Sequence, residues 1–88
     1  MRVEVGLPSQ LTSYSDGASR VWADGATVAE VFDDLDRQFP GLKFRVIDEQ
    51  GRIRRHMRVF IGRDAARDVA AAVPPGQPVL IFGALSGG

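Results

Sequence analysis

The sequence predicts an α+β domain in which a mixed sheet of about five strands packs on one main helix. Three observations carry this prediction. Residues 1–7 alternate strictly, with Val3, Val5 and Leu7 on one face, which is typical of a half-buried strand. Residues 28–39 repeat apolar side chains at helical spacing, and residues 79–82 form a short apolar run that indicates a buried strand.

The first half of the chain predicts two strands followed by the helix. Pro8 ends the first strand, residues 9–18 form a loop, and residues 19–23 are the second strand. Thr27 and Glu30 have the spacing of a capping box, in which Thr27 accepts from the Glu30 amide and Glu30 accepts from the Thr27 amide. Pro40-Gly41 ends the helix. Its apolar stripe comprises Val28, Val31, Phe32, Leu35 and Phe39.

The second half predicts three more strands and no confident helix. Residues 42–47 alternate as a third strand, and residues 52–61 follow a turn as a fourth. Residues 65–73 are too short and too weakly patterned for a helix, and residues 74–78 form a proline-rich turn into the last strand. Two hairpins would therefore flank the helix, with one face of the sheet left open.

Two charged clusters each allow a binding role and a simpler structural one. The carboxylates of Asp33, Asp34 and Asp36 lack the glycine turn and spaced ligands of a calcium loop, so a solvated helix face is favoured. A basic cluster could grip phosphate or RNA, but it has one neighbouring ring, so a solvated strand or an acidic protein partner is favoured. The basic cluster comprises Arg52, Arg54, Arg55, His56 and Arg58.

Composition narrows the class of protein. The 88 residues suit one domain, and 11 basic against 11 acidic residues leave no net charge to attract nucleic acid or anionic membrane. Cysteine is absent, which excludes disulfides and thiolate metal sites. We therefore expect a cytoplasmic protein that binds neither nucleic acid nor membrane, has no metal site and carries no catalytic group of its own.

The last residues, Gly87 and Gly88, have a chemical use. Glycines can pass through a channel too narrow for a side chain, so a terminal carboxylate on Gly88 could be delivered into a partner's active site. A carboxylate is a poor electrophile, so the partner would have to activate it. We expect a folded domain over residues 1–83 and a flexible tail over residues 84–88. The simpler alternative is a frayed end or a leftover linker.

Strand parity predicts an apolar patch beside this tail. If Val59 and Ile81 point toward the helix, then Phe60, Leu80 and Phe82 point away from it onto the open face. An exposed patch of this kind marks a partner surface. The alternative is that a bulge shifts the parity and these side chains belong to the core.

The residues from 57 to 64, from 75 to 82 and from 86 to 88 resemble the ubiquitin-like sulfur-carrier family. That family includes the small subunit of molybdopterin synthase, the carrier of the thiamine pathway and the carrier of a thiocarboxylate route to cysteine. Upstream segments fit the cysteine-type and molybdopterin-type carriers better than the shorter thiamine type. They are Leu7-Pro8, the Gly17 loop, residues 25–28, Leu35, residues 39–42 and residues 48–55.

The resemblance implies a β-grasp fold and a carrier rather than an enzyme. An E1-like adenylyltransferase would use ATP and Mg²⁺ to adenylate Gly88, and a sulfur donor would convert it to a thiocarboxylate for a sulfur-accepting synthase. Gly87 would supply clearance, and Phe60, Leu80 and Phe82 would dock the partner. A metalloprotease that trims or releases the tail is a further implied partner. A ubiquitin-like modifier conjugated through Gly88 and a non-covalent β-grasp interaction domain are the alternatives.

Overall fold

The structure, a computed structural model, describes residues 2–83. The first half contains strand β1 (Arg2–Gly6), the short 3-10 helix η1 (Ser9–Leu11), strand β2 (Arg20–Asp24) and helix α1 (Val28–Gln38). The second half contains helix α2 (Leu42–Val46) and strands β3 (Met57–Ile61), β4 (Asp64–Ala65) and β5 (Val79–Gly83). The tail predicted over residues 84–88 lies outside the described residues.

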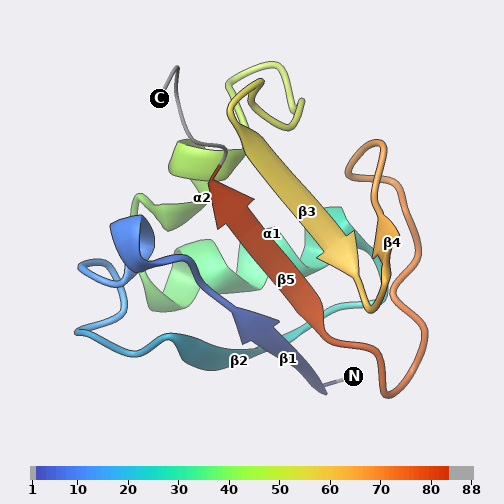
Figure 1. The fold of residues 1–88 in the computed structure, drawn as a ribbon, viewed down its shortest axis with the longest axis horizontal. Helices are drawn as coiled ribbons and strands as arrows, with labels where there is room; N and C mark the ends of the chain where they lie inside the picture. The colour runs from blue at the N-terminus through green and yellow to red at the C-terminus, as the bar shows by residue number, and fades with distance from the viewer. Residues whose placement is uncertain (1, 84–88) are drawn as a thin grey trace.

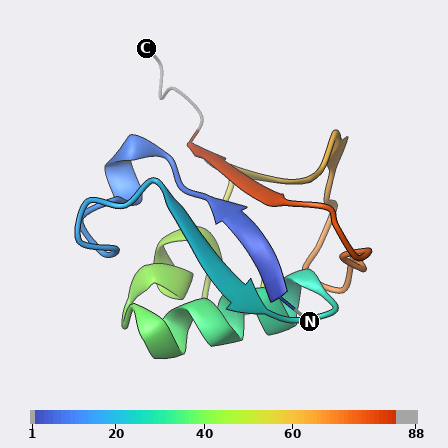
Figure 2. The ribbon, with the colours of Figure 1, turned by 90° about the horizontal axis from the view of Figure 1, so that it is seen from below.

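The strands form one mixed five-stranded sheet in the order β2-β1-β5-β3-β4 (Figure 1). The central pair, β1 and β5, is parallel, and the other neighbours are antiparallel. Helices α1 and α2 lie on one side of the sheet, and the other side is left open (Figure 2). The α+β class, the main helix and the open sheet face predicted from the sequence are confirmed.

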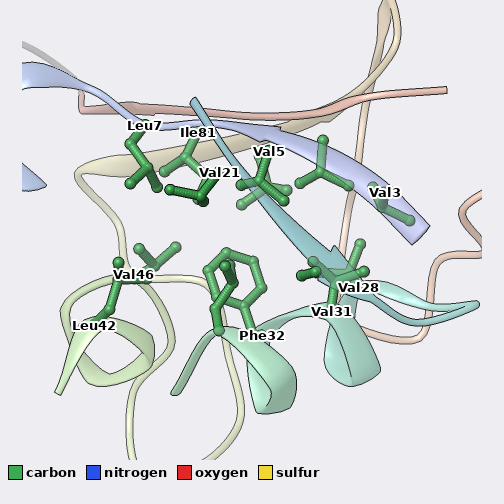
Figure 3. Close-up of a cluster of buried hydrophobic side chains, with 14 of the residues drawn as sticks. Val3, Val5, Leu7, Val21, Val28, Val31, Phe32, Leu42, Val46 and Ile81 are labelled. Carbon is green, nitrogen blue, oxygen red and sulfur yellow. The ribbon is translucent and has the colours of Figure 1, made fainter. Parts of the chain in front are cut away.

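The core lies between the sheet and α1. Val5 and Ile81 project from the sheet toward Phe32, which is fully buried on the helix (Figure 3). Val79 of β5 and Leu35 of α1 are fully buried in the same core. The predicted stripe of α1 is therefore its buried face, and Phe39 caps the C-terminal end of that face. Apolar burial of these side chains is the main stabilising contribution.

The third predicted strand is wrong, because residues 42–46 form α2. This segment also fits a helical spacing, because Leu42 and Val46 are four residues apart and both are buried, while Phe44 is 54% exposed. Gly41 enters α2 with a φ of 95°, in the left-handed region that glycine adopts easily. A helical period thus explains the burial better than the strand period does.

Loss of that strand also shortens the next one. β3 begins at Met57 rather than at residue 52, and Ile53 makes a single bridge to Ile47. The predicted second hairpin does not form, because β3 pairs with β5 and with the two-residue strand β4. The residues between 74 and 78 do turn the chain, with Gly76 at a φ of 84°.

The capping box of α1 forms in part as expected. The Thr27 hydroxyl accepts from the Glu30 amide at 3.2 Å. The Glu30 carboxylate accepts from the Ala26 amide at 2.8 Å rather than from that of Thr27, which corrects the sequence expectation. The carboxylate still satisfies a backbone donor just before the first turn of the helix.

Asp34 of α1 is not on a solvated face, as the sequence had indicated, but is buried against β2. Ser19 bonds to Leu7 of the preceding segment, so by alternation Trp22 and Asp24 turn their backbone groups away from β1. Asp34 accepts from the Asp24 amide at 2.9 Å, and Gln38 donates to the Trp22 carbonyl at 2.8 Å. Side chains of α1 therefore occupy the outer edge of β2.

Candidate functional site

The apolar patch predicted on the open face is made by Phe60 of β3 and by Leu80 and Phe82 of β5. Phe60 lies opposite Leu80, and Arg58 lies opposite Phe82, so all four side chains share one face. The rings of Phe60 and Phe82 meet edge to face, with centroids 5.6 Å apart and planes at 83°. Phe82 is 50% exposed, whereas Phe60 and Leu80 are half-buried. The predicted parity is confirmed, while the role of the patch in docking stays a prediction.

Gly6 of β1 is part of this surface, although the sequence did not single it out. It pairs with Leu80, and a Cβ at Gly6 would lie 3.0 Å from Leu80 Cδ2. The missing side chain therefore leaves room for Leu80 to lie over β1. The alternating pattern of β1 does not predict this contact, because any polar residue at position 6 would fit the same alternation.

Two of the predicted site residues, Gly87 and Gly88, lie outside the described residues. What the structure does describe is the strand leading to them. Gly83, the last residue of β5, pairs with Met57 at the start of β3. The apolar patch therefore lies at the end of β5, close to the point where residues 84–88 begin.

The predicted basic cluster lies at the same end of the sheet, mostly in the turn before β3 rather than in a strand. Arg58 donates to the carbonyls of Arg55 and Met57, at 2.8 and 2.9 Å. Arg54 donates to the Phe44 carbonyl at 2.8 Å, and its guanidinium lies 4.4 Å from the centroid of the Phe44 ring. His56 is exposed. Arg67 joins this cluster from the segment after β4, and no local pattern in the sequence indicated it.

Two carboxyl groups have lowered pKa values, and both have structural causes. The Asp24 amide is the main cause that lowers the pKa of Asp34, helped by Gln38 and the Arg37 guanidinium and opposed by burial. The pKa of Asp48 is lowered mainly by the Arg52 amide and also by the Gln50 amide, against some desolvation. Neither group lies in the apolar patch, so these shifts stabilise the fold and give no indication of acid–base catalysis.

No cluster of residues suited to hold a metal ion occurs within residues 2–83. In the same range, no helix is long and apolar enough to cross a membrane. A cavity of about 650 Å³ opens beside β4, near Ile61, Arg63 and Pro74, and shares no residue with the apolar patch.

The comparisons with known proteins agree with this geometry, although no family model matches the chain. The sulfur carrier protein CysO of Mycobacterium tuberculosis is 29% identical over 93 residues, and the alignment covers 100% of both proteins. A chain from the crystal structure of the Amycolatopsis orientalis BexX/CysO complex is 31% identical, with a TM-score of 0.91 over 98% of this chain and 99% of that one.

A third similar structure is SAMP1 from Haloferax volcanii, with 28% identity and a TM-score of 0.82 over 100% of both chains. Small archaeal modifier proteins and CysO thus share the fold described above, in which a mixed sheet packs on one main helix. The sequence identity to CysO, and the fact that the alignment spans nearly the whole of both chains, support a family relationship. The chain belongs to the ubiquitin-like sulfur-carrier family, with CysO among its relatives.

Proposed function

We propose that this protein carries sulfur as a thiocarboxylate on Gly88 and donates it in a biosynthetic reaction catalysed by a partner. The observation that carries the proposal is the match to CysO along 98% of the chain, at a TM-score of 0.91. The position of the apolar patch at the end of β5 supports it. A partner that packs on Phe82 would also lie close to the start of the segment leading to Gly88.

The chemistry requires activation by another protein. A carboxylate is a poor electrophile, because an α-carboxyl group has an ordinary pKa of roughly 3.3–3.7 and is therefore negatively charged at neutral pH. An E1-like adenylyltransferase that binds ATP and Mg²⁺ would let a carboxylate oxygen attack the α-phosphorus, with pyrophosphate leaving. A sulfide-equivalent donor would then attack the acyl carbon, and AMP would leave to give the thiocarboxylate.

This protein would contribute position rather than catalysis. The apolar patch would dock the activating enzyme and, in turn, the sulfur-accepting synthase, while Gly87 would let the chain enter a narrow channel. A metalloprotease that trims or releases the tail is a third proposed partner. The cytoplasm would supply the ATP that the first step consumes.

The experiment that tests the proposal is an intact-mass measurement. The protein is incubated with ATP, a sulfide source and a candidate E1-like adenylyltransferase, beside a variant that lacks Gly88. A mass gain equal to the replacement of one oxygen by sulfur, confined to the full-length protein, is the expected result. No gain with several such enzymes, each shown to act on its own carrier, would contradict the proposal.

A ubiquitin-like modifier is the second candidate, and the SAMP1 neighbours favour it. In that case the activated Gly88 would form an isopeptide bond to a lysine of a target protein. Lys43 is the one lysine of this chain, and its ammonium lies 2.6 Å from the Asp33 carboxylate. Covalent conjugates of higher mass in cells would support this candidate, and their loss on deletion of Gly88 would tie them to the C-terminus.

A further inference from the structure

The charge of this neutral protein is divided unevenly along the chain. Residues 52–67 contain six arginines and one acidic residue, Asp64, which gives a formal charge of 6 − 1 = +5. The rest of the chain then holds 11 − 6 = 5 basic and 11 − 1 = 10 acidic residues, a formal charge of −5. A large local field of this kind guides an oppositely charged partner even when the net charge is zero.

Four of these arginines surround one hollow in the surface. A cavity of about 210 Å³ is lined by Arg54, Arg55, Arg58 and Arg67, with Met57 and Val59 among its apolar lining, and it includes no carboxylate. We call it the basic pocket. Met57 and Val59 are buried, whereas Arg55, Arg58 and Arg67 are exposed.

Two of the four guanidinium groups of the basic pocket, those of Arg54 and Arg58, are held in place by partners that do not neutralise them. The ion pairs within residues 2–83 join Arg20 to Glu4, Arg37 to Asp34 and Lys43 to Asp33, so none involves the basic pocket. Backbone carbonyls fix Arg58, and the Phe44 ring and carbonyl fix Arg54. Because these side chains are already ordered, binding an anion would cost less conformational entropy than usual.

The basic pocket and the apolar patch at the end of β5 are linked by Arg58, which lines the pocket and pairs with a residue of the patch. Arg58 lies opposite Phe82, and Met57 lies opposite Gly83. We propose that the basic pocket binds a carboxylate-rich segment of the partner protein that receives residues 84–88. This proposal rests on the proposed function, since that function places a partner at this end of the sheet.

Two features favour an acidic protein segment over nucleic acid. The neighbouring Phe44 ring is covered by Arg54, and the half-buried Phe60 ring packs edge to face against Phe82. Phe82 is therefore left as a single half-exposed ring on this side of the pocket, which is thin support for the stacking of successive bases. The remaining chain has a formal charge of −5, derived above, which repels a phosphate backbone beyond the pocket. Arginine beside an apolar and aromatic surface is instead typical of protein interfaces.

The first test is a titration of the full chain with a hexaglutamate peptide, followed through backbone amide NMR shifts. We expect shifts confined to residues 53–59 and 65–67. Arg55→Ala and Arg67→Ala should each weaken binding about threefold to fivefold, as expected for an exposed charge pair. The matched control is Arg45→Ala on α2, which removes the same charge from an exposed arginine outside the pocket and should leave binding nearly unchanged.

Three outcomes would overturn the proposal. They are shifts spread over the whole surface, an equal loss in Arg45→Ala, and tighter binding of a hexauridine RNA than of hexaglutamate. A thermal melt of each variant separates lost binding from lost folding.

The second test compares the rate of thiocarboxylate formation in Arg55→Ala and Arg45→Ala. Slower formation in Arg55→Ala, but not in Arg45→Ala, supports the proposal. If the wild type is converted and Arg55→Ala is converted at the same rate, the proposal is overturned, whereas the carrier function is not. Hexaglutamate binding without conversion of the wild type by any active enzyme would instead contradict the carrier function.

Discussion

If the proposed activating enzyme packs on the apolar patch, replacing Phe82 with alanine should weaken its binding while leaving the fold intact. A phenylalanine buries about 150–250 Å² in a core or interface. Because Phe82 is 50% exposed, about 100 Å² of it remains available to a partner. At roughly 25 cal/mol per Å² of apolar surface, its complete burial contributes about 2.5 kcal/mol.

That free energy corresponds to a change of about 60-fold in the dissociation constant. The assay is calorimetric titration of the activating enzyme with the carrier, or the KM of the enzyme for the carrier. Trp22→Ala is the matched control, because Trp22 has a similar exposed fraction of 44% but lies on β2, outside the apolar patch and the basic pocket. An unchanged dissociation constant for Phe82→Ala, or an equal loss for Trp22→Ala, would refute the reasoning.

Three further predictions concern stability. Folding lowers the pKa of Asp34 below its reference value of 3.8. The ionised carboxylate therefore makes its full contribution to stability above pH 3.8, and that contribution is lost as the pH falls through the lower pKa of the folded state. In urea unfolding, Asp34→Asn should destabilise the protein at neutral pH and do so progressively less in acid. Leu35→Ala should cost about 3 kcal/mol in the same assay, because Leu35 is fully buried, and a loss below about 1 kcal/mol would mean that the core is loosely packed. Gly25→Ala should cost about 1–3 kcal/mol, because its Cβ would lie 2.6 Å from the Val31 amide nitrogen in the backbone of α1, and an unchanged melting temperature would show that the helix can shift.

The parts of the fold that sequence patterns predicted are those in which one period was unambiguous. Val3 and Val5 fit a strand alone, and the α1 stripe fits a helix alone. The segment beginning at Leu42 satisfied both periods over a length too short to separate them, and its burial was decided by contact with α1. β4 has only two residues, which no periodicity can reveal.

The candidate site divides in the same way. Phe60, Leu80 and Phe82 could be assigned to one face because alternation is fixed within each strand and the two strands pair directly. Arg67 and Gly6 reach this end of the molecule through tertiary pairing, about which their local sequence carries no information. The sequence pattern predicts a solvated Asp34, because a helix face that carries several carboxylates is usually exposed. In the structure Asp34 accepts from the Asp24 amide ten residues earlier, a partner that no local pattern reveals.

The contacts that α1 makes to the outer edge of β2 affect how the protein behaves when crowded. An edge strand with open backbone donors and acceptors recruits strands from other molecules and so seeds aggregation. The Trp22 carbonyl already accepts from Gln38 and the Asp24 amide already donates to Asp34, so an incoming strand would not find these two groups open. Removing both side chains would therefore expose this edge and lower the solubility of the protein at high concentration.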